Sequence, residues 1–447
     1  MGGAGMSGIA EVLSDYDIEV SGCDLALGPV TERLERLGVE VSEGHSADHL
    51  DGVDLVVKSS AVADDNPELV AARERKITVV RRAEMLGELM RLKYGIAIAG
   101  THGKTTTTSL IGAVLTEAGL DPTVLVGGRL RVSGTGARLG RSDYLVAEAD
   151  EYDRSFLRLQ PIIAVVTSID SDHLDTYLDL DEIRAAFVDF AGKVPFFGQI
   201  VLCLDDENIQ SVLPELAEHR LVTYGLSPQA DLTAVDLVTE DGGTRFAIEG
   251  EGGEALGEVR LPMPGEHNVL NALAAVAVGR AVGLELPTIA AALGEFSGVH
   301  RRFERLGEWR GAAVVDDYAH HPTEVAATLR AARQVFPRAR LIAVFQPHLY
   351  SRTRDLADEF GRVLLGADEA VVTGIYASRE EPLVGVAAEL IVVAAPRSGH
   401  RSVCLCSDWR QVPKRLGDRV RPGDVVLTLG AGDIYRLAEH LVREEAA

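Results

Sequence analysis

The sequence has few cysteines, no long apolar run and no excess of positive charge, and each absence excludes a class of protein. Its 4 cysteines form no Cys-x-x-Cys pair, which argues against a zinc module or a disulfide framework and favours reduced thiols in a cytoplasmic protein. No apolar segment reaches membrane-spanning length, and no secretory signal is visible, so we expect no membrane insertion. The net charge of −24 argues against nucleic acid as the main partner.

Short apolar segments alternate with amphipathic helical segments along most of the chain. A chain of 447 residues is too long for one ordinary core, and this alternation is typical of α/β domains with parallel sheets. The rhythm changes near residues 95 and 300, and residues 231–262 have the pattern of antiparallel hairpins. We therefore predict an α/β protein of three domains: 1–94, 95–299 with the antiparallel insert, and 300–447.

A shortened phosphate-binding motif dominates the predicted central domain. Tyr94–Ala99 is expected to be a buried strand, and Thr105–Ala118 has helical spacing, with a glycine turn between them. The usual P-loop has an additional glycine where Ile98 stands here. Lys104 can reach the β- and γ-phosphates, and the Thr105 hydroxyl can bind Mg²⁺. The predicted nucleotide-binding residues are Gly100, Thr101, His102, Gly103, Lys104, Thr105 and Thr106.

Acidic and histidine side chains follow two further predicted strands of this domain. The segment Tyr144–Glu148 ends in an acid, and His173 follows the strand predicted over residues 162–167. We expect Glu148 and His173 to converge with Thr105 on Mg²⁺. Threonine is a poor helix former, so we also expect the hydroxyls of the run Thr105–Thr108 to face metal or phosphate.

Weaker signals lie at the amino terminus and before a later helix. Residues 2–8 (GGAGMSG) and Asp24 are arranged as in a dinucleotide-binding domain, although a plain N-terminal arm is the alternative. No strand precedes these glycines, so we expect either a start further upstream or a sheet without its first strand. His267 and Asn268 precede an alanine-rich helix, where they suit a base edge, a ribose or a simple helix cap.

Two strand ends of the predicted C-terminal domain carry clustered polar residues. Residues 316–324 read DDYAHHPTE, and residues 346–354 read QPHLYSRTR. Ligands bind beyond the carboxyl ends of strands in open parallel sheets, so paired histidines and spaced arginines there indicate a site. Surface charge is the simpler explanation for any one of these residues.

Together these motifs resemble the Mur ligase family, whose members form amide bonds with ATP in peptidoglycan synthesis. The resemblance covers essentially the whole chain and implies a uridine-nucleotide-binding domain, an ATPase domain and a Rossmann-like domain for ADP and the amino acid. Two motifs, DDYAHHPTE and FQPHLYSRT, are more specific to the subgroup that uses L-alanine. The other motifs are GGAGMSGIAEVL, SSAV with NPE, AGTHGKTTTT, EADEYDRSFL, SIDSDHLDTY, PGEHNVLNA, RRFE and GAGDI.

The resemblance implies a reaction, cofactors and site residues. L-Alanine would be joined to the carboxylate of UDP-N-acetylmuramate through an acyl phosphate, with ATP and Mg²⁺ as cofactors. We expect a cytoplasmic monomer or weak homodimer. The implied catalytic residues are Lys104, Glu148, His173, His321 and Arg352; ATP would also contact His267, Asn268 and Arg302; the UDP-sugar would contact Gly3, Gly5, Met6, Ser7, Ser21, Asp24, His45, Ser59 and Ser60.

Three alternatives stay open from the sequence. A murein-recycling ligase would join a tripeptide to the same UDP-sugar and shares most of these motifs. A P-loop ATPase switch would bind ATP without forming an amide, although two further α/β segments with polar strand ends argue against it. A sugar-nucleotide dehydrogenase built on the N-terminal glycines would leave the P-loop without a role.

Overall fold

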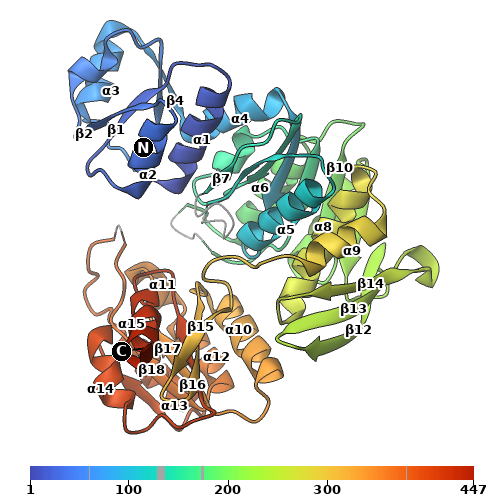
Figure 1. The fold of residues 1–447 in the computed structure, drawn as a ribbon, viewed down its shortest axis with the longest axis vertical. Helices are drawn as coiled ribbons and strands as arrows, with labels where there is room; N and C mark the ends of the chain where they lie inside the picture. The colour runs from blue at the N-terminus through green and yellow to red at the C-terminus, as the bar shows by residue number, and fades with distance from the viewer. Residues whose placement is uncertain (60, 128–135, 173–175, 379, 447) are drawn as a thin grey trace. The chain divides into compact units, whose positions relative to one another are not determined.

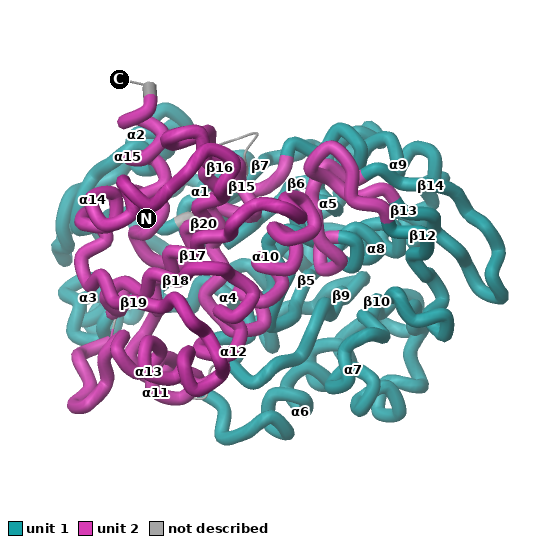
Figure 2. Tube along the Cα trace, turned by 90° about the horizontal axis from the view of Figure 1, so that it is seen from below, with its two compact units in different colours: residues 1–237, 246–260, 269–297 teal, residues 238–245, 261–268, 298–447 magenta. Residues whose placement is uncertain are grey.

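The computed structural model describes residues 1–447 except 60, 128–135, 173–175, 379 and 447 (Figure 1). The chain divides into two compact units (Figure 2). Unit 1 comprises residues 1–237, 246–260 and 269–297, and unit 2 comprises residues 238–245, 261–268 and 298–447. Within the described residues, no helix is both long and apolar enough to cross a lipid bilayer.

The first ninety or so residues of unit 1 form two separate pairs of parallel strands, each with flanking helices. The sequence pattern also predicts a strand over residues 18–20, and this prediction is wrong, because the first strand begins at Ser21. The first helix ends at Asp15; Asp17 follows with a φ of 57°, and the next three residues serve as a connector in which Ile18 is 50% exposed. The pairs are β1 (Ser21–Asp24) with β2 (Glu40–Glu43) and β3 (Leu55–Lys58) with β4 (Thr78–Arg81); the helices are α1 (Ala4–Asp15), α2 (Pro29–Arg36), α3 (Pro67–Arg75) and α4 (Arg82–Arg91).

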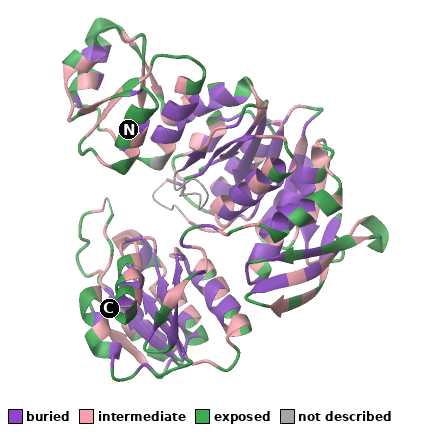
Figure 3. Ribbon diagram, viewed as in Figure 1, coloured by how far each residue is buried: buried purple, intermediate pink, exposed green. Residues whose placement is uncertain are grey.

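A parallel sheet lies at the centre of unit 1, and its middle strand leads into the phosphate-binding motif. That strand, β5 (Tyr94–Ala99), has the predicted bounds and lies between β8 (Tyr144–Glu148) and β9 (Ile163–Val166). These strands are almost wholly buried, as apolar strands covered on both faces should be (Figure 3). Also in this region are β6 (Thr123–Leu125), β7 (Ala137–Arg138), β10 (Gln199–Cys203), β11 (Leu221–Gly225), α5 (Lys104–Glu117), α6 (Leu180–Ala191) and α7 (Glu207–Val212).

A hairpin insert continues the central sheet beyond β11, as the sequence predicted. The full strand order is β14-β13-β12-β11-β10-β9-β5-β8-β6-β7, so the sheet is mixed. The two-residue turn of Asp241 and Gly242 has positive φ at both positions, 50° and 78°, which suits a tight hairpin. The elements are β12 (Leu232–Glu240), β13 (Gly243–Glu249), β14 (Ala255–Leu261), α8 (Glu266–Ala281) and α9 (Leu286–Gly294).

Unit 2 is built on a six-stranded sheet in the order β15-β16-β20-β17-β18-β19. Successive residues of its strands alternate between two apolar clusters: Ala343 packs with one, and Ile342 and Val344 pack with the other. Helices on both faces complete a three-layer arrangement. The elements are β15 (Glu304–Trp309), β16 (Ala312–Asp317), β17 (Leu341–Phe345), β18 (Glu369–Val372), β19 (Val403–Leu405), β20 (Val425–Leu429), α10 (Pro322–Val335), α11 (Tyr350–Asp355), α12 (Ala357–Val363), α13 (Glu389–Arg397), α14 (Val412–Leu416) and α15 (Tyr435–Ala446).

Candidate active site

The glycine turn between β5 and α5 needs both of its glycines. Gly100 has a φ of 136°, and a Cβ there would lie 2.0 Å from the Thr167 hydroxyl. Gly103 has a φ of 84°, and a Cβ there would lie 2.5 Å from the Asn271 side-chain oxygen. No side chain caps the helix that starts after Gly103. The first N–H groups of a helix lack partners within it, so this uncapped end suits an anionic oxygen.

In a phosphate-binding turn, the backbone N–H groups are expected to converge on phosphate. Two of them donate within the protein instead. The Thr101 N–H donates to the Ser168 carbonyl at 3.0 Å, and the His102 N–H donates to the Ser168 hydroxyl at 3.0 Å. The His102 ring lies 3.0 Å from the Asp170 carboxylate. Thr101 and His102 therefore anchor the turn to the segment after β9.

Lys104 is held at the start of α5 by a buried acid. Its ammonium donates to the Gly100 carbonyl at 2.7 Å and to both carboxylate oxygens of Glu151 at 2.8 Å. Burial lowers the pKa of Lys104, but the negative charges of Glu151 and Asp150 outweigh burial, so the pKa is raised above its usual value. The side chain is thus a fixed cation beside the helix N-terminus.

Glu148 ends β8 and meets Thr105 at the start of α5. Burial raises the pKa of Glu148, although hydrogen bonds from the Thr105 hydroxyl and the Gly127 N–H oppose this effect. Its Oε1 atom is buried and has no hydrogen-bond partner among the residues described. A divalent cation would compensate this carboxylate, and the hydroxyl–carboxylate pair supplies the oxygen ligands that Mg²⁺ prefers. His173, the third predicted ligand, lies outside the described residues.

The remaining threonines of the run have packing roles, so the prediction that they face metal or phosphate is wrong for at least two of them. Thr107 and Thr108 are both 0% exposed, and Thr106 is also buried. The Thr107 hydroxyl donates to the Asn271 side-chain oxygen at 3.0 Å, which ties α5 to α8. Their positions inside a helix were visible in the sequence, but the face that each occupies was not.

At the amino terminus, the structure brings Asp24 to the glycine segment. The Gly2 N–H donates to the Asp24 carboxylate at 2.6 Å. Burial alone would raise the pKa of Asp24, but this hydrogen bond and the positive amino terminus lower that pKa to about 2. Most of the glycine segment, residues 2–8, is helical, because α1 begins at Ala4. Gly5, Met6 and Ser7 consequently lie in its first turn, and Gly3 caps it.

The other predicted UDP-sugar residues are spread over three loops and strand ends. Ser21 begins β1, and His45 follows β2. Ser59 follows β3, and its hydroxyl accepts a hydrogen bond from the Ala61 N–H at 3.3 Å. Ser60 lies outside the described residues.

In unit 2, the two arginines that precede β15 have different surroundings. Arg301 is buried, pairs with Asp316 at 2.9 Å and lies against two tyrosine rings, so it holds β16 in place. Arg302, the predicted ATP contact, lies 5.3 Å over the Tyr318 ring. Burial raises the pKa of Asp317 to about 6, although the charge of Arg302 opposes this shift.

His267 and Asn268 lie inside the first turn of α8, not before it as predicted. The Asn268 side chain donates to the Pro264 carbonyl at 2.7 Å. Burial, with the positive charges of Arg330 and Arg302, lowers the pKa of His267 to about 4. His267 is therefore a neutral imidazole at physiological pH, able to donate and accept hydrogen bonds.

The two polar strand ends of unit 2 lie next to each other. His321 caps α10, with its Nδ1 accepting a hydrogen bond from the Thr323 N–H at 3.4 Å. Arg352 is buried in α11, and its guanidinium lies 3.3 Å from His348 Nδ1. The rings of His320 and His348 are 5.6 Å apart, which brings the loops after β16 and β17 into contact.

Sequence reasoning did not assign a role to Glu151, Ser168, Asp170 or Asn271. Glu151 is one of several acids that follow β8, and it is the ion-pair partner of Lys104. Its signal was an acid three residues beyond the strand end, in a run where the sequence could not distinguish one carboxylate from another. Asn271 had no signal, because its contact with α5 joins positions that are far apart in the chain.

Comparisons with known proteins agree across the whole chain. Sequence models described as the Mur ligase family catalytic domain, the Mur ligase middle domain, and the Mur ligase glutamate ligase domain match residues 1–94, 98–279 and 301–432. Proteins named UDP-N-acetylmuramate–L-alanine ligase from Syntrophotalea carbinolica and Geotalea uraniireducens are each 52% identical, with 99% of this chain and 96% of the relative covered.

Solved structures give the same result. The crystal structure of the UDP-N-acetylmuramate–alanine ligase from Thermotoga maritima matches with a TM-score of 0.82 and 30% identity, covering 100% of this chain and 97% of that one. A murein peptide ligase from Psychrobacter arcticus matches with a TM-score of 0.71 and 25% identity, covering 99% and 96%. With relatives half identical over its full length and all three family regions present, the chain belongs to the Mur ligase family and has its three-domain α/β fold.

Proposed function

We propose that this chain joins L-alanine to the carboxylate of UDP-N-acetylmuramate, using ATP, in the synthesis of peptidoglycan precursors. The observation that carries the proposal is full-length similarity, at 52% identity, to relatives that are named for this reaction. The arrangement of Lys104, Thr105 and Glu148 around an uncapped helix N-terminus supports ATP as the energy source.

The reaction needs activation because a carboxylate is a poor acyl donor. A carboxylate oxygen attacks the γ-phosphorus of ATP, the bond to the β-phosphate oxygen breaks, and an acyl phosphate and ADP form. The amine of L-alanine then adds to the acyl carbon and loses a proton. The tetrahedral intermediate expels inorganic phosphate, which leaves the amide. Catalysis is mostly positioning and charge neutralisation.

Residues of the phosphate-binding turn and of the neighbouring strand ends would neutralise the charge of the phosphates. The Lys104 ammonium would meet the negative charge on the transferring phosphoryl group, and Glu151 holds it in place. The N–H groups that begin α5 would bind phosphate oxygens. Thr105 and Glu148 would hold one Mg²⁺, and Glu148 with His173 a second. When bound, Mg²⁺ offsets phosphate charge.

The remaining assignments complete the proposal. Residues 1–94 would bind the UDP-sugar through the glycine segment, Asp24 and His45; residues 95–299 would bind ATP; and residues 300–447 would serve ADP and the amino acid. Near the adenosine we place His267, Asn268 and Arg302. The amino acid or the developing charge would be met by His321 and Arg352. We also propose that the protein acts in the cytoplasm as a monomer or weak homodimer.

A comparison of two acceptors tests this function. ADP and amide formation are measured with UDP-N-acetylmuramate, ATP and either L-alanine or the murein tripeptide. We expect turnover with L-alanine and little with the tripeptide. Turnover with the tripeptide alone would favour the recycling ligase, and ATP hydrolysis that needs neither substrate would favour a switch; either result would contradict the proposal.

A further inference from the structure

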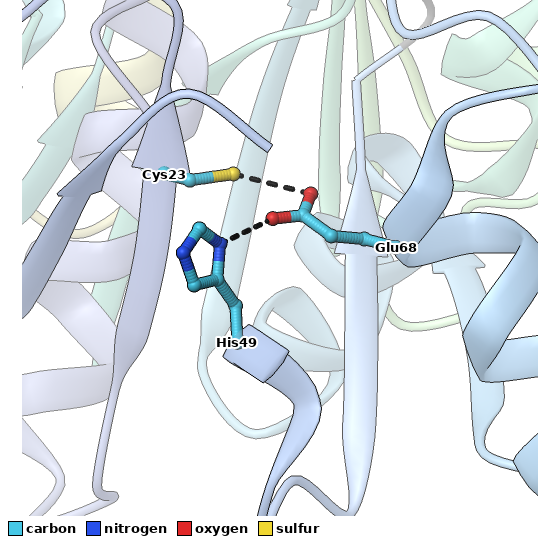
Figure 4. A group of neighbouring side chains, drawn as sticks. All are labelled: Cys23, His49 and Glu68. Carbon is cyan, nitrogen blue, oxygen red and sulfur yellow. Dashed lines mark hydrogen bonds and ion pairs between the residues drawn. The ribbon is translucent and has the colours of Figure 1, made fainter. Parts of the chain in front are cut away.

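Four side chains with metal-binding atoms gather in the N-terminal part of unit 1. They come from separate elements: Cys23 from β1, His45 from the turn after β2, His49 from the short 3-10 helix Ala47–Leu50, and Glu68 from the first turn of α3. Figure 4 shows the Glu68 carboxylate between the Cys23 sulfur and the His49 ring. All four elements precede β4 and lie within residues 21–75, whereas the phosphate-binding turn begins at Gly100, so the cluster is distinct from the ATP site.

The contacts within this cluster are short. One carboxylate oxygen of Glu68 lies 3.2 Å from the Cys23 sulfur and 3.2 Å from His45 Nδ1. The other oxygen lies 2.7 Å from His49 Nδ1. Cys23 and His45 are 3.1 Å apart at their sulfur and Nδ1 atoms. The ligand atoms of Cys23, His49 and Glu68 all lie within 4.8 Å of one another.

The donor set identifies the kind of ion. A thiolate, two imidazoles and a carboxylate are ligands of Zn²⁺, whereas Mg²⁺ and Ca²⁺ take oxygen ligands. Ligand atoms around a tetrahedral zinc ion lie about 3.3–3.8 Å apart, given bonds of about 2.0–2.3 Å. The atoms of Cys23, His45 and Glu68 lie 3.1–3.2 Å apart, so these three would move outward by a few tenths of an ångström to make room for the ion.

We propose that Cys23, His45, His49 and Glu68 form a binding site for Zn²⁺ or a similar transition-metal dication. Four protein ligands would fill a tetrahedral shell, which is typical of a structural site rather than a catalytic one. The missing Cys-x-x-Cys pair argues against a zinc module whose cysteines are neighbours in sequence, whereas the ligands of this site come from four separate elements.

Binding requires proton release at one ligand. Burial and the neighbouring Glu68 raise the pKa of the Cys23 thiol to about 12, so without the ion the sulfur holds its proton. Zn²⁺ would displace that proton and form a zinc–sulfur bond, with one proton released to solvent. Because metal binding releases this proton, zinc affinity should fall as the solution becomes acidic. With one thiolate and one carboxylate, the dication is fully neutralised.

The position of the site indicates its effect on the fold. The pairs β1–β2 and β3–β4 form separate two-stranded sheets. Cys23 and His45 belong to the first pair, whereas Glu68 belongs to the helix between β3 and β4. One ion would therefore cross-link both halves of this segment and stabilise it. Because His45 is also a proposed UDP-sugar contact, metal binding is measured in the absence of the UDP-sugar.

Cobalt provides a direct test on the full chain. The protein is dialysed against a chelator and titrated with Co²⁺, and the thiolate-to-cobalt charge-transfer absorption is recorded before Zn²⁺ is added in competition. We expect one cobalt ion per chain, with this absorption, displaced by Zn²⁺. In Cys23→Ser the absorption should disappear and zinc affinity should fall by about 100-fold or more, while Cys404→Ser, another half-buried free thiol, should leave both unchanged.

A second variant keeps the test independent of the thiol. His49→Gln retains Cys23 and should keep the charge-transfer absorption, but with weaker binding and an altered visible spectrum, because one nitrogen ligand is lost. ATP binding serves as the folding control for each variant, since the ATP site is separate. The proposal is overturned if the wild-type protein shows no thiolate absorption, if Cys23→Ser keeps it, or if Cys404→Ser loses it.

Discussion

Lys104 is the residue that the proposed phosphoryl transfer needs most, because its ammonium is fixed beside the α5 N-terminus by Glu151. We predict that Lys104→Ala reduces amide formation on the order of 10³-fold while the protein stays folded, as for other groups that neutralise phosphoryl charge. Steady-state turnover and far-ultraviolet circular dichroism measure the two effects. Lys414→Ala, on the surface of unit 2, is the control and should turn over normally. A folded Lys104→Ala protein with near-normal turnover would refute the phosphate-binding role.

Glu148 should act through the metal. Glu148→Gln keeps the side-chain shape and removes the charge. We therefore predict that the apparent affinity for Mg²⁺ falls by at least about 10-fold, with a matching loss of turnover at low Mg²⁺. Turnover measured across a Mg²⁺ titration gives the apparent affinity. Asp153→Asn, an exposed acid after the same strand, should leave that affinity unchanged. If both variants show the wild-type Mg²⁺ dependence, the acid that ends β8 is not a ligand.

At the scale of elements, the two ends of α5 offer a matched pair of glycines. Gly103 and Gly119 have φ values of 84° and 76°, but a Cβ at Gly103 would meet Asn271, whereas one at Gly119 would meet nothing within 4 Å. Both alanine substitutions should lower stability by about 1–2 kcal/mol through backbone strain. Only Gly103→Ala should also lose ATP affinity. Thermal unfolding and ATP titration separate the effects, and equal ATP affinity in the two variants would contradict the role of the turn.

The first turn of α8 should give unit 2 a pH-dependent stability. The pKa of His267 is lowered to about 4 from 6.5, so between these values the unfolded chain binds a proton that the folded chain does not. Stability from this residue is therefore present above pH 6.5 and lost as pH falls toward 4. His267→Gln cannot titrate and should gain on the order of 2–3 kcal/mol relative to wild type across this range. Denaturant unfolding at several pH values measures the difference; a constant difference would contradict the lowered pKa.

The bounds of strands were predictable from the sequence where a strand is buried on both faces. The strands Tyr94–Ala99 and Tyr144–Glu148 have their predicted bounds, because buried parallel strands are continuous apolar runs. Residues 18–20 (Ile-Glu-Val) alternate apolar and polar side chains as an exposed strand would, but they form a connector, since strand pairing begins at Ser21. The local sequence pattern shows where apolar side chains lie. Whether such a segment becomes a strand depends on the strand with which it pairs.

At the scale of the whole molecule, the sequence predicted the contact between Glu148 and Thr105 but not the other contacts between side chains of the site. The adjacency of β5, β8 and β9 brings Glu148 to Thr105. The pairing of Lys104 with Glu151 and the cluster around Glu68 join segments that are distant in the chain. Such contacts depend on side-chain direction and packing, which spacing along the sequence does not encode.

Formation of an acyl phosphate before the amide is the step that defines the proposed reaction of this chain. The most direct measurement uses UDP-N-acetylmuramate labelled with ¹⁸O in its carboxylate, with ATP and L-alanine, followed by mass analysis of the products. Because a carboxylate oxygen becomes the bridge to phosphorus and leaves with it, we predict one labelled oxygen in the inorganic phosphate for each amide formed. Amide formation with unlabelled phosphate, or phosphate release without any amide, would contradict a reaction through an acyl phosphate.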